Sequence, residues 1–302
     1  MMVAVSLWLS LLSFSLGPLA PQAPVQSGYV EVDGGRLYYE QAGSGMPVVL
    51  IHGGYLDNRM WDGQFALIAE RYRAIRYDVR AHGRSPSDSV PFADQDDLRR
   101  LLDELAVPRA VIVGLSMGGR IAIDFALTDP DRVAGLVLVG PGLSGFEPRS
   151  EEIGRYIRDL RASFSSGFPA VYETFAHWWC DGPHRQPSEV DPVVRRRVLE
   201  MLGGSEQRWR YGALERPLRP PAVGRLDEIA VPTLVVVGTL DMPDIDQIAH
   251  LIDQHVPGAE RVYIPGVAHM VNMEKPTEFN DTLMPFLGRL QAEFRGPGST
   301  SG

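Results

Sequence analysis

The residues with the clearest chemical meaning form a Gly-x-Ser-x-Gly pattern at 114–118, with Ser116 at its centre. An apolar run at 110–113 precedes the pattern, and residues 120–127, whose apolar side chains have helical spacing, follow it. A serine that leaves a strand and enters a helix occupies a sharp turn, and glycines two positions away allow strand and helix to approach. The pattern therefore predicts Ser116 as a nucleophile presented on a strand-to-helix turn.

A serine hydroxyl is a weak nucleophile, so it requires a base that takes its proton and an acid that orients the base. In the chain order serine, acid, histidine, Asp241 follows the apolar run 233–237, and His269 follows the last apolar run. Both lie just beyond a predicted strand end, where open α/β sheets bind ligands. Asp244 and Asp246 are alternatives to Asp241, but they fall at the start of the next predicted helix and are interpreted as capping residues. The sequence therefore predicts a serine, histidine and aspartate triad.

Attack on a carbonyl creates a negative oxygen, which backbone N–H groups can stabilise. The segment His52-Gly53-Gly54-Tyr55 follows an apolar run, and its glycines allow the backbone to approach a substrate. The predicted donors are the N–H groups of Gly54 and Met117, with Tyr55 as the alternative to Gly54. His52 is interpreted as a structural residue, because no acidic or cysteine cluster accompanies it in the sequence.

The elements that must position these residues follow from an alternation of short β-branched runs with longer amphipathic stretches. This alternation predicts an α/β fold with a mainly parallel central sheet flanked by helices. Strands are expected at 29–32, 36–40, 48–51, 74–77, 110–113, 135–139, 233–237 and 261–264, and helices around 60–72, 94–105, 120–127, 245–255 and 277–290. The serine, the aspartate and the histidine would then all follow strands of one sheet.

The alternation stops at residues 143–222, where no strand-like run occurs and aromatic side chains, arginines and prolines are frequent. This segment predicts a helical cap, inserted into an α/β core of residues 29–142 and 223–290. Most of its aromatic residues are expected to form the insertion's own core. Three residues are predicted to line an acyl pocket: Tyr55, Trp178 and Trp179.

The composition limits the class of partner. With 302 residues, 44% of them hydrophobic, the chain is long enough to bury a full α/β core. The net charge of −9 argues against a nucleic-acid partner, and the densest basic run, 195–197, is interpreted as a solvated helix face. The single cysteine, Cys180, excludes an intrachain disulfide and offers no metal cluster. Neither a metal ion nor an organic cofactor is expected.

The two ends of the chain are expected to lie outside the folded domain. Residues 3–16 form a short apolar run, followed by small residues and prolines up to Ala23, and the segment 1–23 resembles a secretory signal peptide. The run is too short to predict a permanent membrane anchor. The protein is therefore expected to be secreted or periplasmic, and cytoplasmic if the run is an extra stretch from a misassigned start. Residues 291–302 are expected to form a disordered tail.

Together these motifs resemble the α/β-hydrolase superfamily over about residues 29–290. The resemblance rests on His52-Gly53-Gly54, the segment 78–85 (DVRAHGRS), the turn at Ser116, Asp241, and the segment 266–269 (GVAH). Family members usually carry glycine where Ala81 stands. With serine at the turn, the chain resembles the esterase, lactonase and carbon–carbon hydrolase branches of the superfamily. Haloalkane dehalogenases and epoxide hydrolases use aspartate at this position. Residues 76–78 and 114–119 look most like those of 3-oxoadipate enol-lactonases and small-ester esterases.

The resemblance implies a serine hydrolase that cleaves a carboxylic ester or a lactone through an acyl-enzyme. Its partner would be a small-molecule substrate. An enol-lactonase and a carbon–carbon bond hydrolase are alternatives within the enzyme class. The alternative outside that class is a ligand receptor that keeps the triad but turns over slowly, because this fold hosts several functions.

Overall fold

The structure is a computed structural model that describes residues 24–294, apart from the side chain of residue 293. The predicted signal peptide at 1–23 lies outside the described residues, as does most of the predicted tail. Among the residues that the structure does describe, no helix is both long enough and apolar enough to cross a bilayer.

Eight strands form one sheet, in the spatial order β1-β2-β4-β3-β5-β6-β7-β8. The β1/β2 and β2/β4 pairs are antiparallel, and all the other neighbouring pairs are parallel. The mainly parallel sheet expected from the sequence is therefore confirmed. The strands are β1 Gln26–Val32, β2 Gly35–Ala42, β3 Pro47–Ile51, β4 Arg73–Tyr77, β5 Ala110–Leu115, β6 Val133–Val139, β7 Thr233–Gly238 and β8 Glu260–Ile264.

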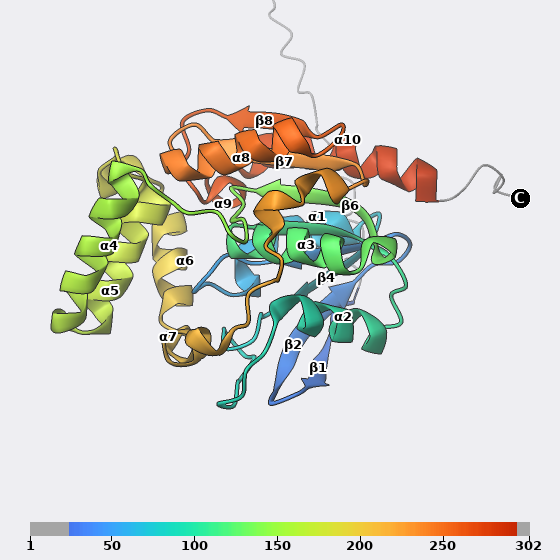
Figure 1. Ribbon diagram of the computed structural model, residues 1–302, viewed down its shortest axis with the longest axis horizontal. Coiled ribbons are helices and arrows are strands. Elements are labelled where there is room, and N and C mark those ends of the chain that lie inside the picture. Colours follow the sequence, from blue (N-terminus) through green and yellow to red (C-terminus); the bar gives the residue numbers. More distant parts are fainter. Residues whose placement is uncertain (1–23, 295–302) are drawn as a thin grey trace, which may run out of the picture.

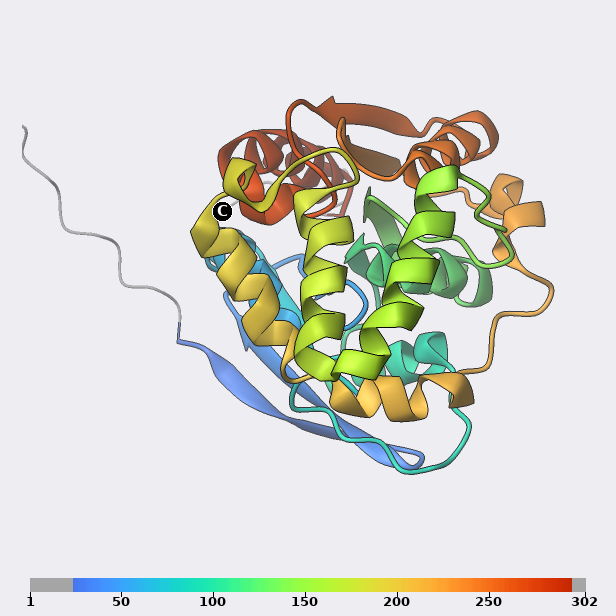
Figure 2. The same cartoon turned by 90° about the vertical axis from the view of Figure 1, so that its left-hand side faces the viewer.

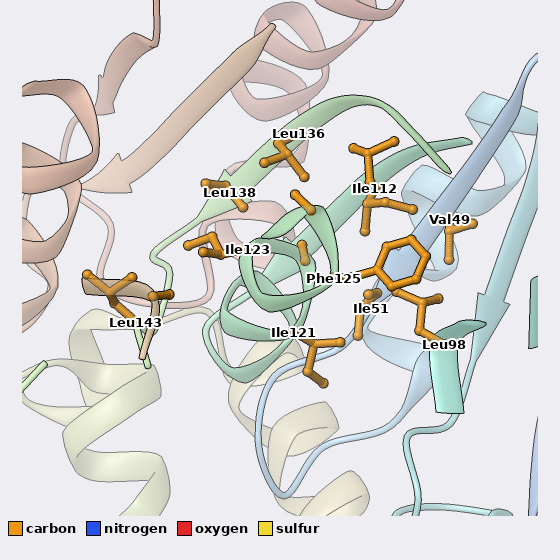
Figure 3. Packing of buried hydrophobic residues seen from close by; sticks show 14 of the residues in the cluster. Val49, Ile51, Leu98, Ile112, Ile121, Ile123, Phe125, Leu136, Leu138 and Leu143 are labelled. Atoms are coloured by element: carbon orange, nitrogen blue, oxygen red, sulfur yellow. The ribbon is translucent and has the colours of Figure 1, made fainter. Parts of the chain in front are cut away.

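Helices cover both faces of this sheet (Figure 1). Side chains alternate between the faces of a strand, so Val49 and Ile51 of β3 join one core cluster while Val48 and Leu50 join the other. The first cluster packs under α2 (Asp94–Glu104), α3 (Met117–Thr128) and α8 (Pro243–His255), and the second under α1 (Asp62–Ala69) and α10 (Pro276–Phe294). Figure 3 shows part of the first cluster, in which strand residues meet the apolar face of α3: Val49, Ile51, Ile112, Leu136, Leu138, Ile121, Ile123 and Phe125.

Two predicted helices differ most from the structure in their bounds. The helix expected around 60–72 is shorter, because a 3-10 turn (Asn58–Trp61) precedes α1 and takes the first residues. At the other end of the chain α10 continues to Phe294, so residues 291–294 are helical and do not belong to a disordered tail. Glutamine, alanine and glutamate at 291–293 are strong helix formers, which explains the extension.

Residues 143–222, all of which are described, contain helices and no β-strand. The main helices are α4 (Glu151–Ser163), α5 (Phe168–Phe175), α6 (Pro192–Leu202) and α7 (Glu206–Tyr211), and a π-helix, Ala176–Asp181, continues α5. They lie together at the left of Figure 1 and face the viewer in Figure 2. Local sequence sets their starts: the Ser150 hydroxyl accepts the Ile153 N–H, and Asp191 accepts the Val193 N–H.

Candidate active site

Ser116 lies on the turn between β5 and α3, with a φ of 55° and a ψ of −111°. A positive φ with this ψ lies outside the main allowed regions for residues other than glycine, so a serine adopts it only where the surroundings enforce it. A side chain at Gly114 would place its Cβ 2.2 Å from the carbonyl oxygen of Gly118, and one at Gly118 would come within 2.3 Å of the Ile51 oxygen. Both glycines of the pattern are therefore required for the approach of strand and helix.

His269 and Asp241 form a buried pair at the ends of neighbouring strands. The two residues lie in the loops after β8 and β7, and 2.7 Å separates His269 Nδ1 from Asp241 Oδ2. The imidazole thus donates its Nδ1 proton to the carboxylate, whose other oxygen accepts the N–H of Met242. His269 Nε2 is buried and has no hydrogen-bond partner among the described residues. This nitrogen is free to accept a proton.

The two alternative aspartates are engaged elsewhere. Asp244 accepts the backbone N–H groups of Arg149 and Ser150, which fixes the chain just before α4. Asp246 is exposed and accepts the hydroxyl of Tyr263. Both lie in the first turn of α8, but Met242 occupies the N-cap position and both carboxylates accept hydrogen bonds from residues outside this helix. Interpreting them as capping residues was therefore wrong.

Gly140, which sequence reasoning missed, allows the histidine and the aspartate to meet. It follows β6 with a φ of +46°, and an added Cβ would lie 3.0 Å from His269 Nδ1 and 3.1 Å from Asp241 Oδ2. Any side chain there would press against both members of the pair. The Gly140-Pro141-Gly142 sequence at a strand end was the available signal, but it does not identify the residues that lie opposite.

We expect Gly140→Ala to reduce kcat about 100-fold, because a displacement of about 1 Å in a catalytic group has an effect of that size. The measurement is steady-state hydrolysis alongside thermal unfolding of the same samples. Gly258→Ala is the matched control, since Gly258 also has a positive φ (+73°) but no atom within 4 Å of the added Cβ. Equal activity losses in the two variants would contradict a specific role for Gly140.

Gly54 and Met117, the predicted oxyanion donors, are neighbours. A Cβ built on Gly54 would lie 3.8 Å from the Cβ of Met117, and neither backbone N–H has an acceptor among the described residues. The preceding N–H, of Gly53, is already used, because it donates to the sulfur of Met60. Met117 is the first residue of α3, where the helix dipole also favours negative charge.

His52 supports the segment that carries Gly54. Its Nδ1 donates to the Gly53 carbonyl (2.8 Å), and its Nε2 accepts the N–H of Val79 (2.9 Å). Complete burial lowers the pKa of His52 and so favours the neutral ring. A neutral ring is required here because one nitrogen donates a hydrogen bond and the other accepts one. The ring therefore joins two loops and has no free nitrogen for proton transfer, in agreement with a structural role.

A cavity of about 130 Å³ brings these groups together between the core and the insertion. Ser116 and His269 both line it, and Tyr156, Phe175 and Trp179 from the insertion cover it. The Trp179 ring lies over that of His269, with 4.7 Å between the ring centroids. The complete lining is Gly53, Gly54, Tyr55, Leu56, Leu115, Ser116, Tyr156, Phe175, Trp179, His269 and Met270. A larger hollow of about 470 Å³ beside α2 contains neither the serine nor the histidine.

Of the three predicted pocket residues, Tyr55 and Trp179 line this cavity and Trp178 does not. Trp178 is buried in the first core cluster, and its Nε1 donates to Asp159 Oδ2 (3.1 Å). Adjacent residues of a helix point in different directions, so only one of the two tryptophans can face His269. The prediction for Trp178 was therefore wrong.

Tyr156 was not recognised from the sequence, although it lines the cavity from α4. Burial raises its pKa to about 12, and a hydrogen bond with Trp179 acts in the opposite direction. The phenol therefore remains protonated at neutral pH. Nothing in the periodicity of α4 separates this tyrosine from ordinary core residues, because its place in the cavity depends on how the insertion packs.

The sequence matches the alpha/beta hydrolase family over residues 48–282, a span that contains Ser116, Asp241 and His269. The chain belongs to the alpha/beta hydrolase family. It has the fold of this family, an eight-stranded, mostly parallel sheet flanked by helices, and it is a hydrolase.

Similar proteins of the alpha/beta hydrolase family come from several bacteria. The pimeloyl-(acyl-carrier protein) methyl ester esterase of Nitrosospira multiformis is 26% identical over 260 residues, which is 83% of this chain and 97% of that protein. A thermophilic esterase from Thermogutta terrifontis is 27% identical with a TM-score of 0.73, covering 88% of this chain and 99% of that one. The enol-lactonase from Burkholderia xenovorans LB400 is 25% identical with a TM-score of 0.72, covering 86% and 100%.

The alpha/beta hydrolase motif at 78–85 keeps its turn although alanine stands at position 81. Ala81 has a φ of +63°, in the left-handed region that favours glycine. Asp78 holds the turn, because its carboxylate accepts the backbone N–H groups of Asn58 and Arg84, each at 2.8 Å. Alanine is therefore accommodated at a position whose conformation favours glycine.

Neither a cluster of metal-ligating side chains nor an activated cysteine occurs in the part of the chain that the structure describes. Within residues 24–294, no group of three or more histidine, cysteine, aspartate and glutamate side chains is arranged to hold a metal ion. Cys180 is buried, and burial raises the pKa of its thiol far above the ordinary value. A thiol that stays protonated is a poor nucleophile.

Proposed function

We propose that Ser116, His269 and Asp241 form a catalytic triad that hydrolyses a carboxylic ester or a lactone through an acyl-enzyme. One observation carries this proposal: His269 donates Nδ1–H to Asp241 at 2.7 Å, while its Nε2 has no described partner and the residue lines the same cavity as Ser116. A base with one nitrogen oriented and the other free is the arrangement that activates a serine hydroxyl.

In the first half of the reaction the Ser116 oxygen adds to the substrate carbonyl, and His269 Nε2 takes the hydroxyl proton. Asp241 holds the imidazole in the required tautomer and stabilises the imidazolium. The tetrahedral intermediate collapses when the bond to the leaving oxygen breaks, and His269 gives its proton to that oxygen. The acyl group then remains on Ser116.

In the second half His269 takes a proton from water, and the resulting hydroxide adds to the acyl carbonyl. Collapse of this intermediate breaks the bond to Ser116, which regains its proton from His269 and releases the acid. The N–H groups of Gly54 and Met117 would stabilise the oxyanion in both halves, since they are neighbours and have no described acceptor.

Ester and lactone substrates are favoured because similar proteins are named for them. The match to this chain covers nearly the full length of the esterase from Thermogutta terrifontis and of the enol-lactonase from Burkholderia xenovorans. Opening a lactone yields one product, whereas cleaving an open-chain ester releases an acid and an alcohol. Chromatography of the products therefore distinguishes these two reactions, and it also distinguishes both from cleavage of a carbon–carbon bond.

The decisive experiment is rapid mixing of the protein with p-nitrophenyl acetate, followed by mass spectrometry of the quenched sample. We expect a burst of one nitrophenolate per protein and an acetyl group on the peptide that contains Ser116. If nitrophenolate is released steadily without a burst, the acyl-enzyme is sought by quenching the reaction at low pH before mass spectrometry. An acetyl group found only on other residues would contradict the proposal, and binding without turnover would favour the receptor alternative.

A further inference from the structure

The cavity beside Ser116 is small for a substrate site. Its volume of about 130 Å³ lies well below the 300–1,000 Å³, roughly, of ordinary ligand pockets. Tyr55, Phe175 and Trp179 are among the aromatic residues that line it. A short acyl group fits such a space, but a longer chain requires further room.

Further room lies close by, in a surface hollow of about 670 Å³ between the insertion and the loop at residues 86–87. Four aromatic residues line this hollow: Phe164, Phe168, Trp209 and Tyr211. Phe164 is 47% exposed and Phe168 is 37% exposed. Glu206, Gln207 and Arg210 provide its polar part. Exposed aromatic rings that gather in a hollow are typical of a surface that binds apolar groups.

A pair of stacked rings joins the lining of the cavity to that of the hollow. Tyr55 lines the cavity and Trp209 lines the hollow, and their rings stack with 4.0 Å between centroids and 20° between planes. Phe164 meets the same indole edge-on at 5.3 Å. Since Tyr55 has a φ of 62° directly after Gly54, its backbone belongs to the tightly constrained oxyanion segment. The indole is the part of this pair that belongs to the insertion.

Ring contacts hold the indole, whereas ion pairs hold the backbone that carries it. Trp209 Nε1 is buried and has no hydrogen-bond partner among the described residues. The neighbouring Arg208 pairs with Glu215, which in turn lies 2.5 Å from Arg120 on α3. Removal of the indole would therefore leave α7 tied to the core. The Tyr55 ring, which lines the cavity, would lose its stacking partner and be free to turn into the vacated space, which would connect the cavity with the hollow.

We propose that Trp209 limits acyl length by holding the Tyr55 wall of the cavity in place, and that the hollow behind it takes the apolar distal part of a longer acyl chain. This inference rests on the proposed ester hydrolysis at Ser116 and adds the residue that determines the size of the substrate. The wild type would then prefer short acyl groups, because a longer chain must displace the indole from its stack with Tyr55.

The test compares p-nitrophenyl acetate with p-nitrophenyl octanoate, which have the same leaving group, on the wild type, Trp209→Ala and Trp209→Phe. We expect the octanoate-to-acetate ratio of kcat/KM to rise at least tenfold in Trp209→Ala, mainly through a lower KM for octanoate. Trp209→Phe keeps an aromatic ring against Tyr55 and should stay near the wild-type ratio. Adding Phe168→Ala to Trp209→Ala should raise the KM for octanoate again, because it removes part of the hollow.

An unchanged ratio in a Trp209→Ala variant whose acetate hydrolysis still depends on Ser116 would overturn this inference and leave the proposed function intact. Loss of the dependence on Ser116 would instead overturn the proposed function. Calorimetric titration with octanoate provides a readout without turnover: Trp209→Ala should bind it about tenfold more tightly than the wild type, and equal affinities would contradict the proposal. If Trp209→Ala does not fold, Trp209→Leu replaces it in both measurements.

Discussion

Replacing Ser116 by alanine should lower kcat for a p-nitrophenyl ester by about a million-fold, the loss measured when a serine nucleophile is removed from a comparable triad. The residue lies on a strained turn between β5 and α3 and shares its cavity with the free Nε2 of His269. Removing the hydroxyl removes the atom that is proposed to form the acyl-enzyme. The measurement is initial nitrophenolate release at saturating ester, with the burst phase recorded separately.

The matched control for this variant is Ser188→Ala, which removes the same hydroxyl from an exposed position in the insertion. It should retain wild-type kcat, and both variants should unfold at the wild-type temperature. A Ser116→Ala enzyme with more than about one hundredth of the wild-type kcat would show that another group attacks the carbonyl.

Replacing Asp241 by asparagine should lower kcat by about ten-thousand-fold while the fold is retained, as happens when the acid of such a triad becomes an amide. In the native pair His269 Nδ1 donates its proton to Asp241 Oδ2. An amide can present its NH2 group to Nδ1, which shifts the imidazole proton to Nε2. A protonated Nε2 cannot accept the proton of Ser116, so the loss should appear in kcat.

Asp244→Asn and Asp246→Asn are the controls, because these residues were the alternatives to Asp241 in the sequence. Asp246→Asn alters an exposed contact with Tyr263 and should change kcat less than threefold. Asp244→Asn weakens the attachment of α4 and should affect thermal unfolding more than kcat. A larger kcat loss in either control than in Asp241→Asn would reassign the acid.

The nucleophile turn and the alternation of strands and helices could be predicted because they depend on local chemistry. Gly114 and Gly118 must be glycine for steric reasons that hold wherever a strand turns sharply into a helix, and the structure shows both in tight contact. Apolar runs of alternating or helical spacing likewise specify their own element type. The eight strands therefore agree with the expected ones within a few residues, whereas helix ends, which depend on weaker preferences, differed more.

The residues that depend on contacts between distant segments could be found only in the tertiary structure. Nothing near Gly140 in the sequence shows that it lies against His269 and Asp241, since three separate strand ends meet there. The same holds for the finding that Trp179 lines the cavity and Trp178 does not, because it depends on the orientation of the helix that carries both residues.

The sequence alone thus determined which residues the proposed chemistry uses, because a serine, an acid and a histidine in this order after strands need only the topology of the sheet to come to one edge. The tertiary structure decided the shape of the site, from the free Nε2 of the histidine to the stacked rings of Tyr55 and Trp209. The shape of the site depends on how the insertion packs over the core. That packing involves many side chains that are distant from one another in the sequence.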